Sequence, residues 1–262
     1  MTYRRVDLSG YCVVSVWFGC NCRCSICMLS RVQDPLPPIG FDRFRAVVTE
    51  VARRRVHDGL ILSGGEVTTF DDLPQYVRLA ASLNWFRKIQ IQTNGRRLRD
   101  GDYVAELVDS GVNEFFVSIQ GLEQSHDATT CVPGSFAETV AGLGNVARHE
   151  VNAISNTVLT TRNLRDIVPL LALLSQTGVS EMQLWNYFPM GPTDPAGMIV
   201  GLGALAALLP ELATVAARAG KPVVLKSFPQ CLDPGEPLFF DSLFPVTALP
   251  DRFWRQFEEC GF

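Results

Sequence analysis

The sequence lacks several features that would each point to a class of protein. Its 262 residues carry 23 Lys and Arg against 27 Asp and Glu, so there is no basic excess to neutralise the phosphates of a nucleic acid. Residues 1–7 have no apolar signal core, and we expect no stretch long and apolar enough to span a bilayer. These absences favour a cytoplasmic protein with no nucleic-acid or membrane partner, whose eight cysteines are thiols or metal ligands.

Three of those cysteines lie in one short run. Cys20, Cys24 and Cys27 follow one another with C-x3-C-x2-C spacing, which places three thiolates on one tight loop. Three thiolates suit a [4Fe–4S] cluster whose fourth iron stays open, whereas a fourth thiolate would close that iron and leave an electron carrier. A vacant coordination site on a metal indicates chemistry.

Other interpretations of this run stay open. Cys22 is surplus to the spacing, and a shift of register between Cys20 and Cys22 is one alternative. A structural zinc site needs four ligands, usually in two separated pairs, and no second pair follows at a suitable distance. A non-catalytic iron–sulfur electron carrier or a zinc-binding module is therefore the hypothesis from another class.

Buried apolar runs alternate with amphipathic helical runs along most of the chain. Six regular β-α units predict a parallel sheet with right-handed crossovers, forming a partial (β/α)6 barrel over residues 1–228. From Pro229 the pattern is irregular, and residues 229–262 are expected to form a short extension packed on the barrel. Strands are expected at 11–18, 59–63, 88–93, 113–120, 152–160, 181–187 and 222–228, and helices at 42–56, 71–84, 100–110, 135–150, 163–177 and 202–219.

Three local signals refine the helices. Ser135 is expected to cap the helix that follows it, with Glu138 completing a capping box. Pro169 is expected to kink its helix, and Pro210 to kink or divide the helix that contains it.

A second motif ends the second expected strand. Gly64 and Gly65 let the backbone approach a ligand closely, and Glu66 can accept a hydrogen bond from an ammonium group. Two glycines also serve an ordinary strand-to-helix turn. The motif gains weight from its position, because active sites of parallel barrels lie at the carboxyl ends of the strands.

The two motifs together resemble those of the radical S-adenosylmethionine (SAM) superfamily, over about the first 190 residues. The resemblance implies a six-unit partial barrel, and a [4Fe–4S] cluster that binds SAM at its open iron. It further implies reductive cleavage of SAM to a 5′-deoxyadenosyl radical that abstracts a hydrogen atom, with an electron donor such as flavodoxin or ferredoxin. By resemblance the cluster ligands are Cys20, Cys24 and Cys27, and Ile26, Gly64, Gly65 and Glu66 contact SAM.

Polar residues at later strand ends are further candidates for binding SAM or substrate. Such residues also cap helices, so each has a structural alternative. The candidates are Thr93 and Asn94 after the third strand, Ser118 and Gln120 after the fourth, and Asn156 in the fifth. His126 is a candidate for proton transfer or a structural histidine, and Trp185, Tyr187 and Met190 are candidates for a pocket wall or for the core.

The substrate is less constrained than the cofactor. Cys231 has three interpretations: a buried thiol, a ligand of a second cluster with Cys260, or a hydrogen donor to a substrate radical. No winged-helix region precedes the first strand, so we favour a small polar biosynthetic substrate, such as a sugar, aminocyclitol or amino-acid derivative. Maturation of a ribosomally made peptide is the alternative, and oxidoreductase, epimerase and lyase outcomes all stay open.

Overall fold

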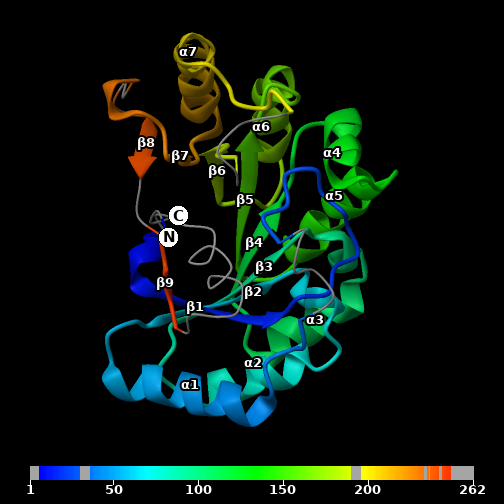
Figure 1. Ribbon diagram of the computed structural model, residues 1–262, viewed down its shortest axis with the longest axis vertical. Coiled ribbons are helices and arrows are strands. Elements are labelled where there is room, and N and C mark those ends of the chain that lie inside the picture. The colour runs from blue at the N-terminus through cyan, green and yellow to red at the C-terminus, as the bar shows by residue number, and fades with distance from the viewer. Residues whose placement is uncertain are drawn as a thin grey trace.

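One curved parallel sheet organises the chain, with helices covering its outer face (Figure 1). The strand order is β8-β7-β6-β5-β4-β3-β2-β1-β9, and every neighbouring pair is parallel. The sheet is not closed, since β8 and β9 form its two edges. The computed structural model describes residues 6–29, 36–189, 196–232, 235, 237–241 and 244–248.

The elements follow in the alternating order expected for β-α units. The strands are β1 (Tyr11–Trp17), β2 (Gly59–Gly64), β3 (Lys88–Thr93), β4 (Glu114–Ser118), β5 (Asn152–Leu159), β6 (Glu181–Asn186), β7 (Val223–Lys226), β8 (Leu238–Asp241) and β9 (Val246–Thr247). The α-helices are α1 (Phe41–Arg54), α2 (Leu73–Ser82), α3 (Gly101–Ser110), α4 (Glu123–Thr130), α5 (Ser135–Val146), α6 (Ile167–Ser175) and α7 (Leu202–Ala219). Short 3-10 turns are η1 (Leu8–Gly10), η2 (Val67–Thr69), η3 (Arg96–Arg99), η4 (Leu164–Asp166) and η5 (Gln230–Leu232).

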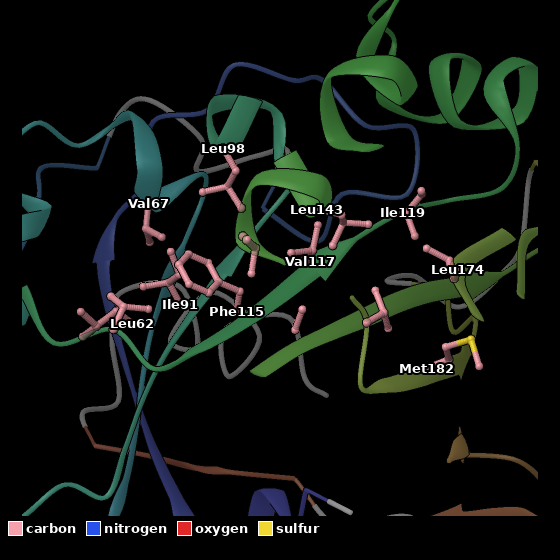
Figure 2. Packing of buried hydrophobic residues seen from close by; sticks show 14 of the residues in the cluster. Leu62, Val67, Ile91, Leu98, Phe115, Val117, Ile119, Leu143, Leu174 and Met182 are labelled. Atoms are coloured by element: carbon pink, nitrogen blue, oxygen red, sulfur yellow. The ribbon is translucent and has the colours of Figure 1, made fainter. Parts of the chain in front are cut away.

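The central strands, such as β2, β4 and β7, are largely buried on both faces, which explains their apolar composition. Side chains alternate along a strand, so Leu62, Ile91 and Val117 pack toward the helices in the main core (Figure 2). Ile61 and Phe116 lie on the opposite face and belong to a second, smaller cluster inside the barrel. The predicted partial barrel of parallel β-α units is confirmed.

Several local expectations were wrong. The N-cap of α5 is Gly134, in the left-handed region at φ 80°, and not Ser135, whose hydroxyl donates to Asp127 Oδ1 at 2.9 Å. Glu138 forms no capping box because it pairs with two arginines instead. Pro169 lies in the first turn of α6, where its missing N–H has no intrahelical partner to lose. Pro210 lies inside α7, which runs on undivided, so the expected division was wrong and the expected kink stays a prediction.

Three elements were not anticipated. Helix α4 lies in a stretch expected to be a loop, and β8 and β9 lie in the extension expected to be irregular. The strands β8 and β9 occupy opposite edges of the sheet, although only residues 242–245 separate them in the sequence. Phe244, in this connection, makes an edge-to-face contact with Trp185 at 5.6 Å between ring centroids.

Helix α7 tests the expectation that no stretch of the chain is long and apolar enough to span a bilayer. Within the part of the chain that the structure describes, it is the one helix long and apolar enough to cross a bilayer by length and composition, so the expectation of no such stretch was wrong. A single helix of this kind is weak evidence, because core helices pass the same test. One side of α7 is buried through Leu205, Leu209 and Leu212 in the main core.

The ends of β1 and β2 approach each other unusually closely. Gly64 has φ +142°, and a Cβ atom there would lie 1.8 Å from the carbonyl oxygen of Trp17. The next residue, Gly65, donates its N–H to that same oxygen at 2.7 Å. Only glycine fits at position 64, because any side chain meets rigid backbone.

We therefore expect Gly64→Ala to lower the free energy of unfolding by about 3 kcal/mol, the upper range for one strained backbone position. The matched control is Gly144→Ala in α5, where a Cβ meets nothing within 4 Å, and it should raise stability by about 0.5–1 kcal/mol. Urea unfolding followed by circular dichroism measures both. If the two substitutions change the free energy of unfolding equally, the close approach of β1 and β2 at Gly64 is contradicted.

Candidate active site

The loop that carries the three cysteines follows β1 and lies across the carboxyl ends of neighbouring strands. At one side Glu66 donates its N–H to the Gly19 carbonyl at 2.8 Å. At the other side Arg23 and Ser25 donate theirs to carbonyls at the end of α4, at 3.1 and 2.8 Å. The loop therefore rests on two supports that are far apart in the sequence, at the end of the sheet where parallel barrels place their chemistry.

The thiols on this loop differ in exposure. Cys20, Cys24 and Cys27 are partly exposed, whereas Cys22 is 1% exposed. The Cys22 sulfur accepts a hydrogen bond from Asn94 Nδ2 at 3.4 Å. Cys22 is thus engaged with the turn after β3, which agrees with its interpretation as surplus to the ligand set.

Burial and hydrogen bonding favour the protonated form of two of these thiols. A hydrogen bond to Cys22, together with burial, raises the pKa of Cys20, and burial raises the pKa of Cys27. Among the described residues, no three His, Cys, Asp or Glu side chains already converge on a point that could hold a metal. Metal binding to these thiols therefore releases protons and draws the sulfurs together.

Glu66 lies beneath the loop and is 1% exposed. Its Oε1 accepts from the Thr68 N–H at 3.1 Å and from the hydroxyls of Thr68 and Thr93, both at 2.6 Å. Its Oε2 accepts from the Asn94 N–H at 2.5 Å. Burial raises the pKa of this carboxyl, and the four donors oppose the shift. The structure thus brings together three predicted residues, Glu66, Thr93 and Asn94.

The two glycines of the second motif have a packing role that sequence reasoning missed. A Cβ on Gly65 would lie 2.5 Å from the carbonyl oxygens of Phe18 and Gly19. The absence of side chains at these two glycines therefore allows the end of β2 to lie directly against the cysteine loop. Ile26, predicted to pack against SAM, is partly buried on that loop.

The remaining strand-end candidates separate into two kinds. Gln120 is occupied by the protein, since its Oε1 accepts from the Val158 N–H at 2.9 Å. Ser118 and Asn156 are register partners on β4 and β5 and face the barrel interior. Asn156 is 5% exposed, and among the residues that the structure describes its Nδ2 has no hydrogen-bond partner. Buried donors without partners are rare, so this amide fits an acceptor on a bound molecule.

A charged pair at the ends of β7 and β8 was not foreseen. Lys226 and Asp241 are register partners, and Lys226 Nζ lies 2.7 Å from Asp241 Oδ2. Lys226 is fully buried, and the Phe244 ring centroid lies 5.2 Å from its Nζ. The sequence signal for this pair was a lysine near the end of the strand expected at 222–228. A buried ion pair is weak evidence for stability, because the cost of desolvating both charges offsets their attraction.

Comparison with known families identifies the chain. The sequence model of the radical SAM superfamily matches residues 14–174. The chain belongs to the radical SAM superfamily. Members of this family use a [4Fe–4S] cluster and SAM, and the three partly exposed thiols and the unpaired Asn156 amide fit those two groups.

Radical SAM relatives of known activity differ in what they act on. The chain is 29% identical over 178 residues to AdoMet-dependent heme synthase of Methanosarcina barkeri, covering 67% of this chain and 50% of the relative. It is 28% identical over 162 residues to GTP 3′,8-cyclase of Tolumonas auensis, covering 60% and 46%. The chain therefore spans about half the length of these curated relatives.

Solved structures of radical SAM proteins share the fold. Streptococcus suis SuiB bound to S-adenosylmethionine superposes with a TM-score of 0.65 at 16% identity, covering 88% of this chain and 49% of SuiB. Methylornithine synthase (PylB) superposes with a TM-score of 0.64 at 12% identity, covering 96% and 82%. At such identities the likeness concerns the fold alone.

The other candidates occupy varied places. His126 is 1% exposed, and its Nδ1 accepts from the Gln120 N–H at 2.9 Å, which fastens the turn between β4 and α4. Trp185 faces the barrel interior, and Tyr187 is partly buried just after β6. Cys231 is exposed, so its interpretation as a buried thiol was wrong. Met190 and Cys260 lie outside the described residues.

Burial lowers the pKa of His126 to about 4. The unfolded chain binds a proton at this histidine near pH 6.5 and the folded chain does not, so stability is lost as pH falls from 6.5 toward 4. We expect His126→Asn, which keeps an acceptor near Nδ1, to remove about 2 kcal/mol of the stability difference between pH 7.5 and 5. Urea unfolding of the wild type and of the variant at both pH values measures this difference. An unchanged pH profile in His126→Asn would refute the argument.

Proposed function

We propose that this chain binds a [4Fe–4S] cluster through Cys20, Cys24 and Cys27 and abstracts a hydrogen atom from a small polar substrate. The observation that carries the proposal is the position of the cysteine loop, held over the carboxyl ends of the strands by backbone hydrogen bonds to both sides. Three thiols on such a loop leave one iron of a cluster open, which an electron carrier does not need.

The polypeptide positions the two cofactors and shields them. When bound, the cluster supplies the electron that cleaves SAM and so yields the radical that attacks the substrate. Glu66 Oε2 accepts one hydrogen bond in the structure and has capacity for another, from the amino group of SAM. Asn156 donates to an acceptor on SAM or on the substrate. Flavodoxin or ferredoxin in the cytoplasm is the electron donor that we propose.

We propose that the substrate binds at β5–β7, beside SAM. This part of the barrel interior presents the Asn156 amide, the Trp185 ring and the Lys226–Asp241 pair. Polar and charged groups beside an aromatic wall favour a small polar molecule that carries a charge. The names of the curated relatives, such as GTP 3′,8-cyclase, refer to small molecules and agree with this choice. Peptide maturation is the alternative, and Cys231 remains a predicted hydrogen donor.

Replacing a cluster ligand tests the central proposal. Anaerobically reconstituted wild-type protein should hold about four irons per chain and form 5′-deoxyadenosine from SAM with dithionite. Cys24→Ala should lose both, while Cys131→Ala, which removes an exposed thiol outside the loop, should keep both. Cys22→Ala should also keep the iron, whereas Cys20→Ala should lose it. Comparing the iron content of these two variants tests whether Cys20 or Cys22 is the first ligand. Zinc in place of iron, or full activity in Cys24→Ala, would overturn the proposal.

A second substitution tests the substrate site. A low-molecular-mass filtrate of a cell extract should stimulate 5′-deoxyadenosine formation by the wild-type protein. Lys226→Met should lose that stimulation and keep the iron, because the substrate loses its charged partner. Lys221→Met is the control, since Lys221 donates to carbonyls at the end of α6 and away from the barrel interior. If only the peptides of the extract stimulate 5′-deoxyadenosine formation, peptide maturation replaces the small polar substrate as the proposed function.

A further inference from the structure

Arg96 reaches from η3 to the cysteine loop. Its Nη1 donates to the Asn21 carbonyl at 2.6 Å and lies 3.7 Å from the Cys22 sulfur. Its Nε donates to Glu138 Oε2 at 2.5 Å, and the side chain is only 16% exposed. One guanidinium therefore connects the centre of the loop to a carboxylate on α5.

Asn94 reinforces this connection from the same turn. Its Nδ2 donates to Asn21 Oδ1 at 2.7 Å and to the Cys22 sulfur at 3.4 Å. Its Oδ1 accepts from the Arg96 backbone N–H at 3.1 Å, so the Asn94 side chain also fixes the backbone from which Arg96 projects. Asn21 and Cys22 lie between the first two predicted ligands, and fixing them fixes where those ligands point.

The charge of Arg96 acts at the same place. Glu138 also pairs with Arg99, so two guanidinium groups share one carboxylate and a positive charge remains near the loop. Arg99 is 59% exposed, and among the described contacts it has none with the cysteine loop. A partly buried charge is screened less by salt than an exposed one. Reduction makes a cluster more negative, so a positive charge nearby stabilises the reduced form.

We propose that Arg96, oriented by Glu138, is a positioning residue for the cluster: it fixes Asn21 and Cys22 and favours the reduced state. This inference rests on the proposed function, because it needs a cluster on the loop. Arg96 supplies geometry and charge and is not itself a ligand. Hydrogen bonds and charges around the sulfurs are among the factors that set the potential of an iron–sulfur centre.

Two arginines that share one carboxylate provide a matched pair of variants. Arg96→Gln should release iron to a chelator about tenfold faster than wild type, the lower range for loss of a residue supporting a metal ligand. Its cluster should also have a more negative midpoint potential by redox titration. Arg99→Gln should lose iron at the wild-type rate and should shift the potential less than Arg96→Gln does, because Arg99 pairs with the same Glu138 from farther away, without a described contact to the loop.

Arg96→Lys separates charge from geometry. Lysine keeps the positive charge and loses the planar fork that joins Asn21 to Glu138. We expect a midpoint potential close to wild type with iron loss still fast. Hydrogen exchange of the metal-free proteins provides a readout without the cluster: amides 20–24 should exchange faster in Arg96→Gln and Arg96→Lys than in Arg99→Gln.

The outcomes distinguish this inference from the function beneath it. Wild-type protein that takes up no iron contradicts the proposed function itself. Wild-type protein with a cluster, and Arg96→Gln equal to Arg99→Gln in iron loss, potential and exchange, overturns the inference alone. If Arg96→Gln does not fold, the test is the hydrogen-exchange rate of amides 20–24 in Arg96→Lys. If these amides exchange at the wild-type rate in Arg96→Lys, the inference is overturned.

Discussion

The buried carboxylate of Glu66 is the interaction on which the rest of the site depends. Removing a carboxylate from water is costly, and four hydrogen bonds from protein donors offset that cost. All four can form only when the ends of β2 and β3 lie in one particular arrangement. One of those donors is the backbone of Asn94, whose side chain holds Asn21 on the cysteine loop. The position of the loop is thus set by strands that come later in the sequence.

Much of the fold could be predicted because most strands are buried on both faces. The bounds of β3 agree with the expectation, since its apolar residues end at a turn signal. Helix α4 could not be predicted, because the residues it buries, such as His126 and Thr130, are polar and show no apolar period. The strands β8 and β9 are only four and two residues long, too short to show a pattern of their own; β8 pairs with β7, the strand before it, and β9 pairs with β1 at the other end of the chain.

The candidate site shows the same division. The cysteine spacing and the glycine pair are local patterns, so their place at the ends of β1 and β2 could be predicted. The partners of Glu66, the Lys226–Asp241 pair and the bond from Arg96 to Asn21 join residues that only the tertiary fold brings together. Sequence spacing therefore indicated which cofactor the chain takes, while the groups facing a substrate became visible only in three dimensions.

The short connection between β8 and β9 limits how far the barrel can open. Five residue steps lead from Asp241 at one edge of the sheet to Val246 at the other, and a fully extended chain of that length spans at most about 18 Å. The two edges are therefore tethered by the chain itself, although among the described residues β8 and β9 are not paired with each other. The tether limits how far these edges can part, so the carboxyl ends of the strands, beside the cysteine loop, are the entrance that needs no parting of the edges.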